Sequence, residues 1–160
     1  RNESSWKDLL ILAKDIPVDV RFLELMPIGE GKEGETISNT TLFQKIKEIY
    51  PDIKPDERKH GNGPAIYYKI PGFEGSIGFI SAIHGGFCDS CNRLRMTSTG
   101  ELKPCLCYDE TISVRDVARC GDSEKIRENI KHAIQIKPKK HCFSEIEKVS
   151  EKKKMAQIGG

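Results

Sequence analysis

The stretch FCDSCNRLRMTSTGELKPC, residues 87–105, concentrates three cysteines and two arginines in nineteen positions. Two residues separate Cys88 from Cys91, a spacing that lets both side chains enter one site from a tight loop. Gly100 favours a turn in the second half of the stretch, because glycine tolerates positive φ. We therefore expect a hairpin with its turn at residues 98–100, which returns Cys105 to the first two cysteines.

The spacing alone leaves the bound group open between zinc and an iron-sulfur cluster. A structural zinc site takes four protein ligands, and the candidates for the fourth are Cys107, His84 or a distant His. On a strand, the Cα atoms of residues 105 and 107 lie roughly 6.6 Å apart, so sharing one ion would need a local bend. A [4Fe-4S] cluster on three thiolates instead leaves one iron open to a substrate. A disulfide staple is disfavoured, because nothing in the sequence directs secretion.

Arg93 and Arg95 stand two residues apart, so on a strand both side chains face the same way. Paired guanidinium groups suit a phosphate or the edge of a purine. The alternative is a solvated strand face with carboxylate partners. The position directly after two of the cysteines favours the ligand-binding interpretation.

Composition limits the class of protein. The chain of 160 residues has 26 Lys and Arg against 24 Asp and Glu, a formal charge of +2 that gives no case for a nucleic-acid partner. No apolar run approaches the roughly 18 residues that cross a bilayer, and the first residues lack the pattern of a signal peptide. The sequence thus predicts a cytoplasmic protein with no membrane partner, and its thiols are expected to be reduced.

The pattern of apolar residues predicts an α+β fold, with a small antiparallel sheet and flanking helices. Breaker-rich residues 26–35 are expected to be a flexible loop, and residues 137–160 a mobile basic tail. The expected helices cover residues 6–13, 40–50, 114–119 and 124–136, and the expected strands residues 18–25, 65–70 and 75–83, the last two as an antiparallel pair.

Three blocks of the chain resemble the GTP 3′,8-cyclase family, radical S-adenosylmethionine enzymes of molybdenum-cofactor biosynthesis. They are FCDSCNRLRMTSTGELKPCL (87–106), VRFLELMPIGEG (20–31) and the terminal Gly159-Gly160. The resemblance implies the part of such an enzyme that follows an incomplete (β/α) barrel. Its expected divisions are 1–31, the last barrel-like helix and strand with a loop; 32–136, an iron-sulfur and GTP-binding domain; and 137–160, the flexible tail.

The resemblance also implies roles for single residues. The three matching cluster ligands are Cys88, Cys91 and Cys105, and the open iron would bind the guanine of GTP. The remaining matches are Arg93, Leu94 and Arg95 for contact with GTP, Arg21 for the triphosphate side, Met26 for S-adenosylmethionine, and Gly159 and Gly160 for a tail that assists catalysis. Without the resemblance, Met26 would be an ordinary core methionine and Arg21 a surface or paired arginine.

The chain departs from the complete family pattern, because the C-x3-C-x2-C motif of the first cluster is missing from the sequence. The first [4Fe-4S] cluster and most of the S-adenosylmethionine site would then belong to a missing amino-terminal part. In the implied full-length reaction, a 5′-deoxyadenosyl radical abstracts the ribose 3′ hydrogen of GTP, and the ribose carbon joins C8 to give 3′,8-cyclo-7,8-dihydro-GTP. The chain alone is expected to be an inactive carboxy-terminal fragment.

The implied partners are GTP, the amino-terminal barrel, a second copy in a homodimer and the downstream cyclic pyranopterin phosphate synthase. A zinc-binding interaction module is the leading alternative, and a structural domain with unloaded cysteines is the second. We expect Cys107, Cys120 and Cys142 to be buried reduced thiols. His84 is expected either to line the cysteine loop or to be a structural residue.

Overall fold

The computed structural model describes residues 5–34 and 37–158, which form two compact units. The first unit takes residues 5–25 and 37–87 of the described chain, and the second takes residues 26–34 and 88–158. None of the described helices combines the length and apolar character needed to cross a membrane.

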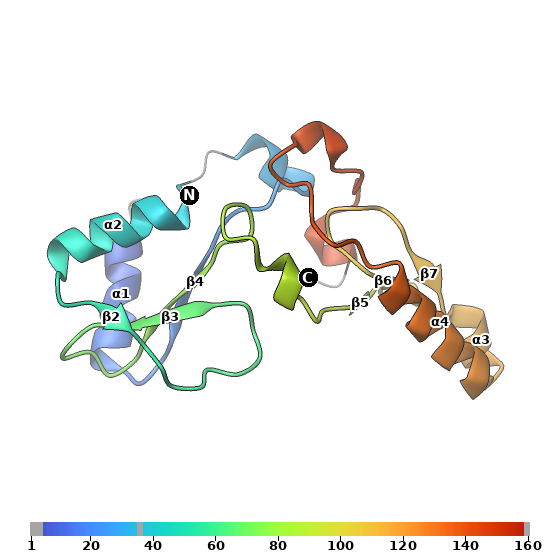
Figure 1. The fold of residues 1–160 in the computed structure, drawn as a ribbon, viewed down its shortest axis with the longest axis horizontal. Helices are drawn as coiled ribbons and strands as arrows, with labels where there is room; N and C mark the ends of the chain where they lie inside the picture. Colours follow the sequence, from blue (N-terminus) through green and yellow to red (C-terminus); the bar gives the residue numbers. More distant parts are fainter. Residues whose placement is uncertain (1–4, 35–36, 159–160) are drawn as a thin grey trace. The chain divides into compact units, whose positions relative to one another are not determined.

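The first unit is a four-stranded sheet with two helices (Figure 1). Its strand order is β1-β4-β3-β2, and β1 runs parallel to β4 while the other neighbours are antiparallel. The elements are α1 (Trp6–Asp15), β1 (Val20–Leu23), α2 (Asn39–Ile49), β2 (Lys54–Pro55), β3 (Ile66–Lys69) and β4 (Ile77–Ile80). The α+β class and the β3–β4 pair are confirmed, and the parallel β1–β4 pair makes this sheet mixed.

The core of the first unit lies between the helices and the sheet. Apolar residues at helical spacing on α1 and α2 meet alternate residues of β3, β4 and the following turns. The buried members are Trp6, Leu10, Ala13, Leu42, Ile46, Ile70, Phe73, Ile77 and Phe79. The Ser38 side chain caps α2 by accepting a hydrogen bond from the Thr41 N–H at 3.1 Å. The helix expected at residues 40–50 is therefore found one residue earlier, at Asn39–Ile49.

Gly78 lets side chains from the two neighbouring strands, β1 and β3, pack against β4. It pairs with Arg21 on one side and Tyr67 on the other. A Cβ at this position would lie 2.8 Å from the Tyr67 ring and 3.0 Å from Arg21 Cγ. The absent side chain lets Tyr67 and Arg21 cross the strand, which a larger residue would prevent.

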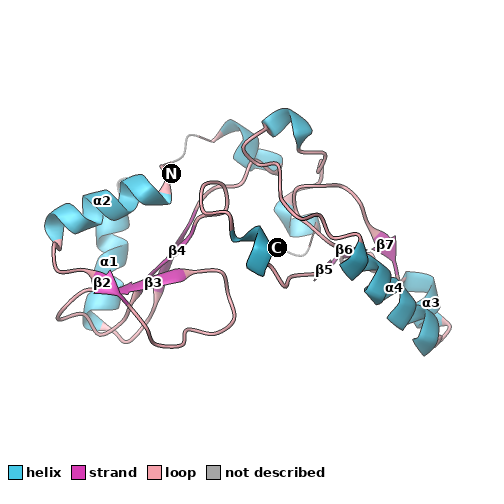
Figure 2. Ribbon diagram, viewed as in Figure 1, coloured by secondary structure: helices cyan, strands magenta, loops and turns pink. Residues whose placement is uncertain are grey.

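The second unit contains the expected hairpin as part of a three-stranded antiparallel sheet, β5-β6-β7 (Figure 2). Gly100 has φ 78°, the left-handed conformation that the predicted turn required. The elements are β5 (Arg95–Met96), β6 (Glu101–Lys103), β7 (Ile112–Ser113), α3 (Arg115–Arg119) and α4 (Ser123–Gln135). The buried residues Leu102, Val114 and Ala133 join the helices to the sheet, as expected from their apolar faces.

Four short 3₁₀ helices are found among the described residues, at Gly29–Glu33, Phe87–Ser90, Ile146–Lys148 and Met155–Gln157. The segment 26–35 was expected to be a loop, and its middle is a 3₁₀ helix. Residues 137–158 pack several side chains into the second unit, namely Cys142, Phe143, Val149, Glu151 and Ile158. Glu151 forms an ion pair with Lys103 of β6, and both side chains are almost fully buried.

Candidate functional site

The first two cysteines of the candidate site lie on one tight turn. Cys88 belongs to the 3₁₀ helix Phe87–Ser90, and the Cys91 N–H donates to the Cys88 carbonyl oxygen at 3.0 Å. Cys105 follows β6 and Pro104. All three side chains are half-buried and are free thiols in the structure. Free, partly shielded thiols are the donor type that soft metal centres use.

The electrostatic surroundings of Cys105 include the other two thiols. Burial raises the pKa of Cys105, and the charges of Cys88 and Cys91 raise it further. The Cys107 N–H and the Lys137 ammonium act in the opposite direction without reversing the shift. Cys105 is therefore within electrostatic range of both other cysteines, as the hairpin prediction requires.

Backbone N–H groups donate hydrogen bonds to two of these sulfurs. The Cys107 N–H lies 3.5 Å from Cys105 Sγ, and the His141 N–H lies 3.4 Å from Cys88 Sγ. Lys137 also donates to the carbonyl oxygens of Arg93 and Pro104, both at 2.9 Å. Residues 137–142 thus supply hydrogen bonds around the cysteine site.

The three thiols are donors of the type that iron-sulfur clusters use. Within residues 5–34 and 37–158, no three His, Cys, Asp or Glu side chains form a group that could hold a metal ion. A [4Fe-4S] cluster spreads its thiolate ligands over separate irons, so its ligands need not converge on one point. Three free soft thiols are compatible with that requirement.

The other cysteines correct the expectation of buried reduced thiols. Cys107 and Cys142 form a disulfide, with Cα atoms 6.3 Å apart. Cys120 is free, as expected, but it is exposed at the end of α3 because its helix leaves that position outside the core. With its sulfur in a disulfide, Cys107 is not a fourth ligand for zinc in this structure, which weakens the zinc alternative.

The arginine segment lies in the same unit as the three thiols. Arg93 is exposed, and Leu94 and Arg95 are half-buried. Arg95 pairs with Lys103 across the β5–β6 ladder, and Leu94 packs against the apolar core of this unit. Backbone pairing and packing therefore fix the segment that carries both guanidinium groups.

The remaining candidates are spread over the chain. Arg21 is exposed on β1 of the first unit, and Met26 is half-buried in the second. Gly159 and Gly160 lie outside the described residues. The structure therefore brings together the cysteines and the Arg93–Arg95 segment within one unit, whereas Arg21 belongs to the other unit.

A buried carboxylate that the sequence reasoning missed holds the turn before the cysteine loop. Glu24, 2% exposed, follows β1 and accepts hydrogen bonds from the N–H groups of Ile83 (2.8 Å), His84 (3.1 Å) and Asn39 (3.1 Å). Its Oε1 also lies 3.1 Å from Nδ1 of His84, whose side chain remains 60% exposed. The signal in the sequence was one acidic residue among the apolar residues of FLELMP.

These contacts determine the protonation of Glu24. Burial alone would raise the pKa of Glu24, but the three backbone donors and the His84 imidazole hold it below its ordinary value. Glu24 is therefore ionised at neutral pH, and its charge joins the end of β1, the start of α2 and the turn at residues 83–84. Of the two roles expected for His84, lining the cysteine loop or supporting the structure, its contact with Glu24 is the structural one.

Changing Glu24 to Gln should lower the free energy of unfolding by about 1 to 3 kcal/mol, because an amide cannot accept all of these hydrogen bonds. Urea unfolding followed by Trp6 fluorescence measures the change, since Trp6 is buried in the same unit. Glu74→Gln is the matched control, because Glu74 is exposed in that unit. Equal stabilities of the two variants would contradict the role of Glu24.

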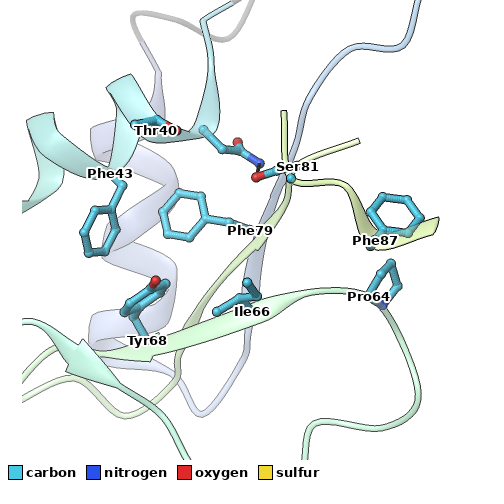
Figure 3. A pocket seen from close by; sticks show the side chains of 10 residues that line it. Thr40, Phe43, Pro64, Ile66, Tyr68, Phe79, Ser81 and Phe87 are labelled. Atoms are coloured by element: carbon cyan, nitrogen blue, oxygen red, sulfur yellow. Dashed lines mark hydrogen bonds between the residues drawn. The ribbon is translucent and has the colours of Figure 1, made fainter. Parts of the chain in front are cut away.

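A separate cavity of about 200 Å³ lies in the first unit, beside α2 (Figure 3). Figure 3 shows Phe43, Tyr68 and Phe79 around it, with Pro64 and Phe87 at the opposite side. Asn39 and Ser81, two of its polar residues, bind each other, with Nδ2 and Oγ 3.2 Å apart. The cavity is mainly apolar and has none of the candidate ligand cysteines in its lining.

Comparison with known proteins gives a consistent set of relatives. The model of the family "Molybdenum Cofactor Synthesis C" matches residues 18–143. A GTP 3′,8-cyclase of Clostridium perfringens (strain 13 / Type A) is 44% identical over 99% of the chain and 50% of its own length. A GTP 3′,8-cyclase of Alkaliphilus metalliredigens is 40% identical over 99% of the chain and 49% of its own length. The molybdenum cofactor biosynthesis protein moc-5 of Caenorhabditis elegans is 40% identical over 89% of the chain and 24% of its own length. The chain spans about half the length of the bacterial relatives.

Proposed function

Because the chain belongs to the Molybdenum Cofactor Synthesis C family, we propose that it is the carboxy-terminal, GTP-binding part of a GTP 3′,8-cyclase. The observation that carries the proposal is the group of three free, half-buried thiols, Cys88, Cys91 and Cys105, in one compact unit. The identity of 44% to a protein of that name over 99% of the chain supports it.

In this proposal, Cys88, Cys91 and Cys105 hold the second [4Fe-4S] cluster of the enzyme. When bound, such a cluster supplies an iron with a free coordination position, which can take a donor atom of the guanine base. The thiols would ligate as thiolates, so the raised pKa of Cys105 means that loading releases a proton there. The N–H groups of Cys107 and His141 are oriented to stabilise the negative sulfurs.

Arg93, Leu94 and Arg95 would position GTP. Guanidinium groups remain charged and bind phosphate or base oxygens through two parallel hydrogen bonds. The two arginines would orient the ribose for hydrogen abstraction, because holding the reactants in the reactive orientation removes much of the entropic barrier. Arg21 would approach the triphosphate, Met26 S-adenosylmethionine, and Gly159 and Gly160 the reacting centre.

The other parts of the reaction would lie in the half of the enzyme that the chain does not span. That half would hold the first [4Fe-4S] cluster and most of the S-adenosylmethionine site, so the chain alone would be inactive. We retain the division at residues 31 and 136, a homodimer, and a downstream cyclic pyranopterin phosphate synthase as parts of the proposal. The complete enzyme would be a radical S-adenosylmethionine lyase that makes 3′,8-cyclo-7,8-dihydro-GTP.

Anaerobic reconstitution tests the cluster. The chain should bind about four iron and four sulfide, and Cys105→Ala should reduce the bound iron to below about one. Cys120→Ala is the control, because Cys120 is a free but exposed cysteine, and it should load like the parent chain. One zinc per chain and no iron would instead favour the zinc-binding interaction module.

Calorimetric titration with GTP tests the substrate. The loaded chain should bind GTP, and the Cys105→Ala chain should bind it at least about tenfold more weakly, because the open iron is lost. Arg95→Gln should also weaken binding by about tenfold, through the loss of one charge-assisted contact. Binding of GTP that is equal with and without the cluster would overturn the proposed role of the iron.

A further inference from the structure

The disulfide between Cys107 and Cys142 joins two segments that contact the candidate cluster ligands. Cys107 donates its own N–H to Cys105 Sγ at 3.5 Å. His141, the neighbour of Cys142, donates its N–H to Cys88 Sγ at 3.4 Å. At one end of the disulfide, Cys107 is itself a donor to Cys105. At the other end, the residue next to Cys142 is a donor to Cys88.

The link is buried and has further backbone support. Cys107 is 0% and Cys142 6% exposed. The Cys142 N–H lies 3.0 Å from Cys107 Sγ, and the Glu151 N–H lies 3.4 Å from the Cys107 carbonyl oxygen. The disulfide thus connects the loop after β6 to residues 137–158 inside the packed part of the second unit.

We propose that the Cys107–Cys142 disulfide is a positioning brace, which holds the N–H groups of Cys107 and His141 against the sulfurs of Cys105 and Cys88. The inference rests on the proposed cluster for its functional meaning, although the brace itself does not need the cluster. Hydrogen bonds to ligand sulfurs tune the reduction potential of an iron-sulfur cluster, and outer partners orient metal ligands. The brace therefore fixes the positions of two N–H donors, which would tune the reduction potential of a cluster bound there.

The first test maps the thiols of the 160-residue chain. The protein is unfolded in iodoacetamide without reductant, digested and analysed by mass spectrometry. The expected result is alkylation of Cys88, Cys91, Cys105 and Cys120, and a linked peptide that contains Cys107 and Cys142. Alkylation of all six cysteines would overturn the brace. Two electrons and two protons from an added dithiol should convert the link to two thiols, with the dithiol oxidised to its own disulfide.

The second test measures positioning in the folded, cluster-free chain. In the Cys107→Ser/Cys142→Ser variant, Cys88 and Cys105 should be alkylated about tenfold faster, because local opening becomes easier once the link is gone. Cys120→Ser is the control and should leave both rates unchanged. Rates in the double variant equal to those of the control would overturn the proposal.

A matched pair at His141 isolates one donor and keeps the disulfide. His141→Pro removes the backbone N–H, whereas His141→Ala retains it and removes only the ring. The proline variant should raise the alkylation rate of Cys88 alone, and the alanine variant should raise it much less. Equal alkylation rates in the two variants would contradict the proposed hydrogen bond. If the Cys107→Ser/Cys142→Ser variant does not fold, the His141 pair still tests the proposal.

Cluster loading separates failure of the inference from failure of the proposed function. In the loaded chain, redox titration followed by electron paramagnetic resonance should give a shifted potential in the double variant and not in Cys120→Ser. An unshifted potential would overturn the tuning role. A chain that binds no iron would contradict the proposed function, while the thiol map and the alkylation rates would still decide the brace.

Discussion

Replacing Glu151 by alanine should lower the free energy of unfolding of the second unit by about 3 to 5 kcal/mol. Glu151 and Lys103 form an ion pair in which the side chains are 2% and 1% exposed. Without the carboxylate, the buried ammonium loses its ion pair and keeps the hydrogen bond to the Tyr108 carbonyl oxygen. Hydrogen exchange of the β6 amides measures the loss, because the single Trp, Trp6, reports on the first unit.

An exposed ion pair provides the control for Glu151. The side chains of Lys148 and Glu145 are 62% and 50% exposed, so Glu145→Ala should cost less than about 1 kcal/mol. Replacing Lys103 by Met and Glu151 by Leu together should recover most of the stability, since no charge is left unpaired. Similar losses for Glu145→Ala and Glu151→Ala would show that burial does not determine the strength of the Lys103 pair.

Replacing Asp56 by asparagine should lower the stability of the first unit by about 1 to 3 kcal/mol at pH 7 and flatten its acid dependence. The Arg58 guanidinium donates to Asp56 at 2.7 to 3.1 Å and holds the pKa of Asp56 well below its usual range. The Ser76 hydroxyl donates at 2.5 Å and acts in the same direction, although burial opposes both. Exposure of Arg58 to solvent moderates the expected effect.

The sign of the pH dependence follows from that lowered pKa. An unfolded Asp titrates near pH 3.9, so the stabilisation is complete above about pH 5 and is lost as pH falls past 3.9 to the folded pKa. Urea unfolding between pH 7 and pH 3, followed by Trp6 fluorescence, measures it. Glu24 has a lowered pKa as well, so the Asp56→Asn chain should retain part of the slope.

Asp52→Asn is the matched control for Asp56, because Asp52 is exposed in the turn after α2. It should behave like the parent chain at every pH. A parent chain whose stability is unchanged between pH 7 and pH 3, or an Asp56→Asn slope equal to the parent slope, would contradict the role of Asp56.

Local signals in the sequence were sufficient for most elements. Ser38 and Asp122 accept hydrogen bonds from the N–H groups of Thr41 and Lys125, at 3.1 and 2.9 Å, and the helices that they cap begin one residue before the expected positions. Gly100 adopts the left-handed conformation on which the hairpin prediction depended. These features depend on residues that are near one another in the chain, so periodicity and turn chemistry suffice.

Features that depend on distant residues could not be predicted in the same way. The parallel pairing of β1 with β4 has no turn between the two strands to reveal it. Cys107 and Cys142 are 35 residues apart, and the reasoning from cellular compartment pointed away from a disulfide. His60 is 41 residues from Asp19 in the sequence, yet its Nδ1 lies 2.7 Å from Asp19 Oδ2, and its Nε2 lies 3.1 Å from Asp56 Oδ2.

The position of β1 at the edge of its sheet affects how readily copies of the chain associate in solution. In the described part of the chain, its outer edge has no strand beside it, and Leu23 and Leu25 nearby are 59% and 46% exposed. An open strand edge beside apolar side chains is a template on which further chains can add. Self-association should therefore rise with protein concentration and limit how long a stock remains clear, whatever the state of its cysteines.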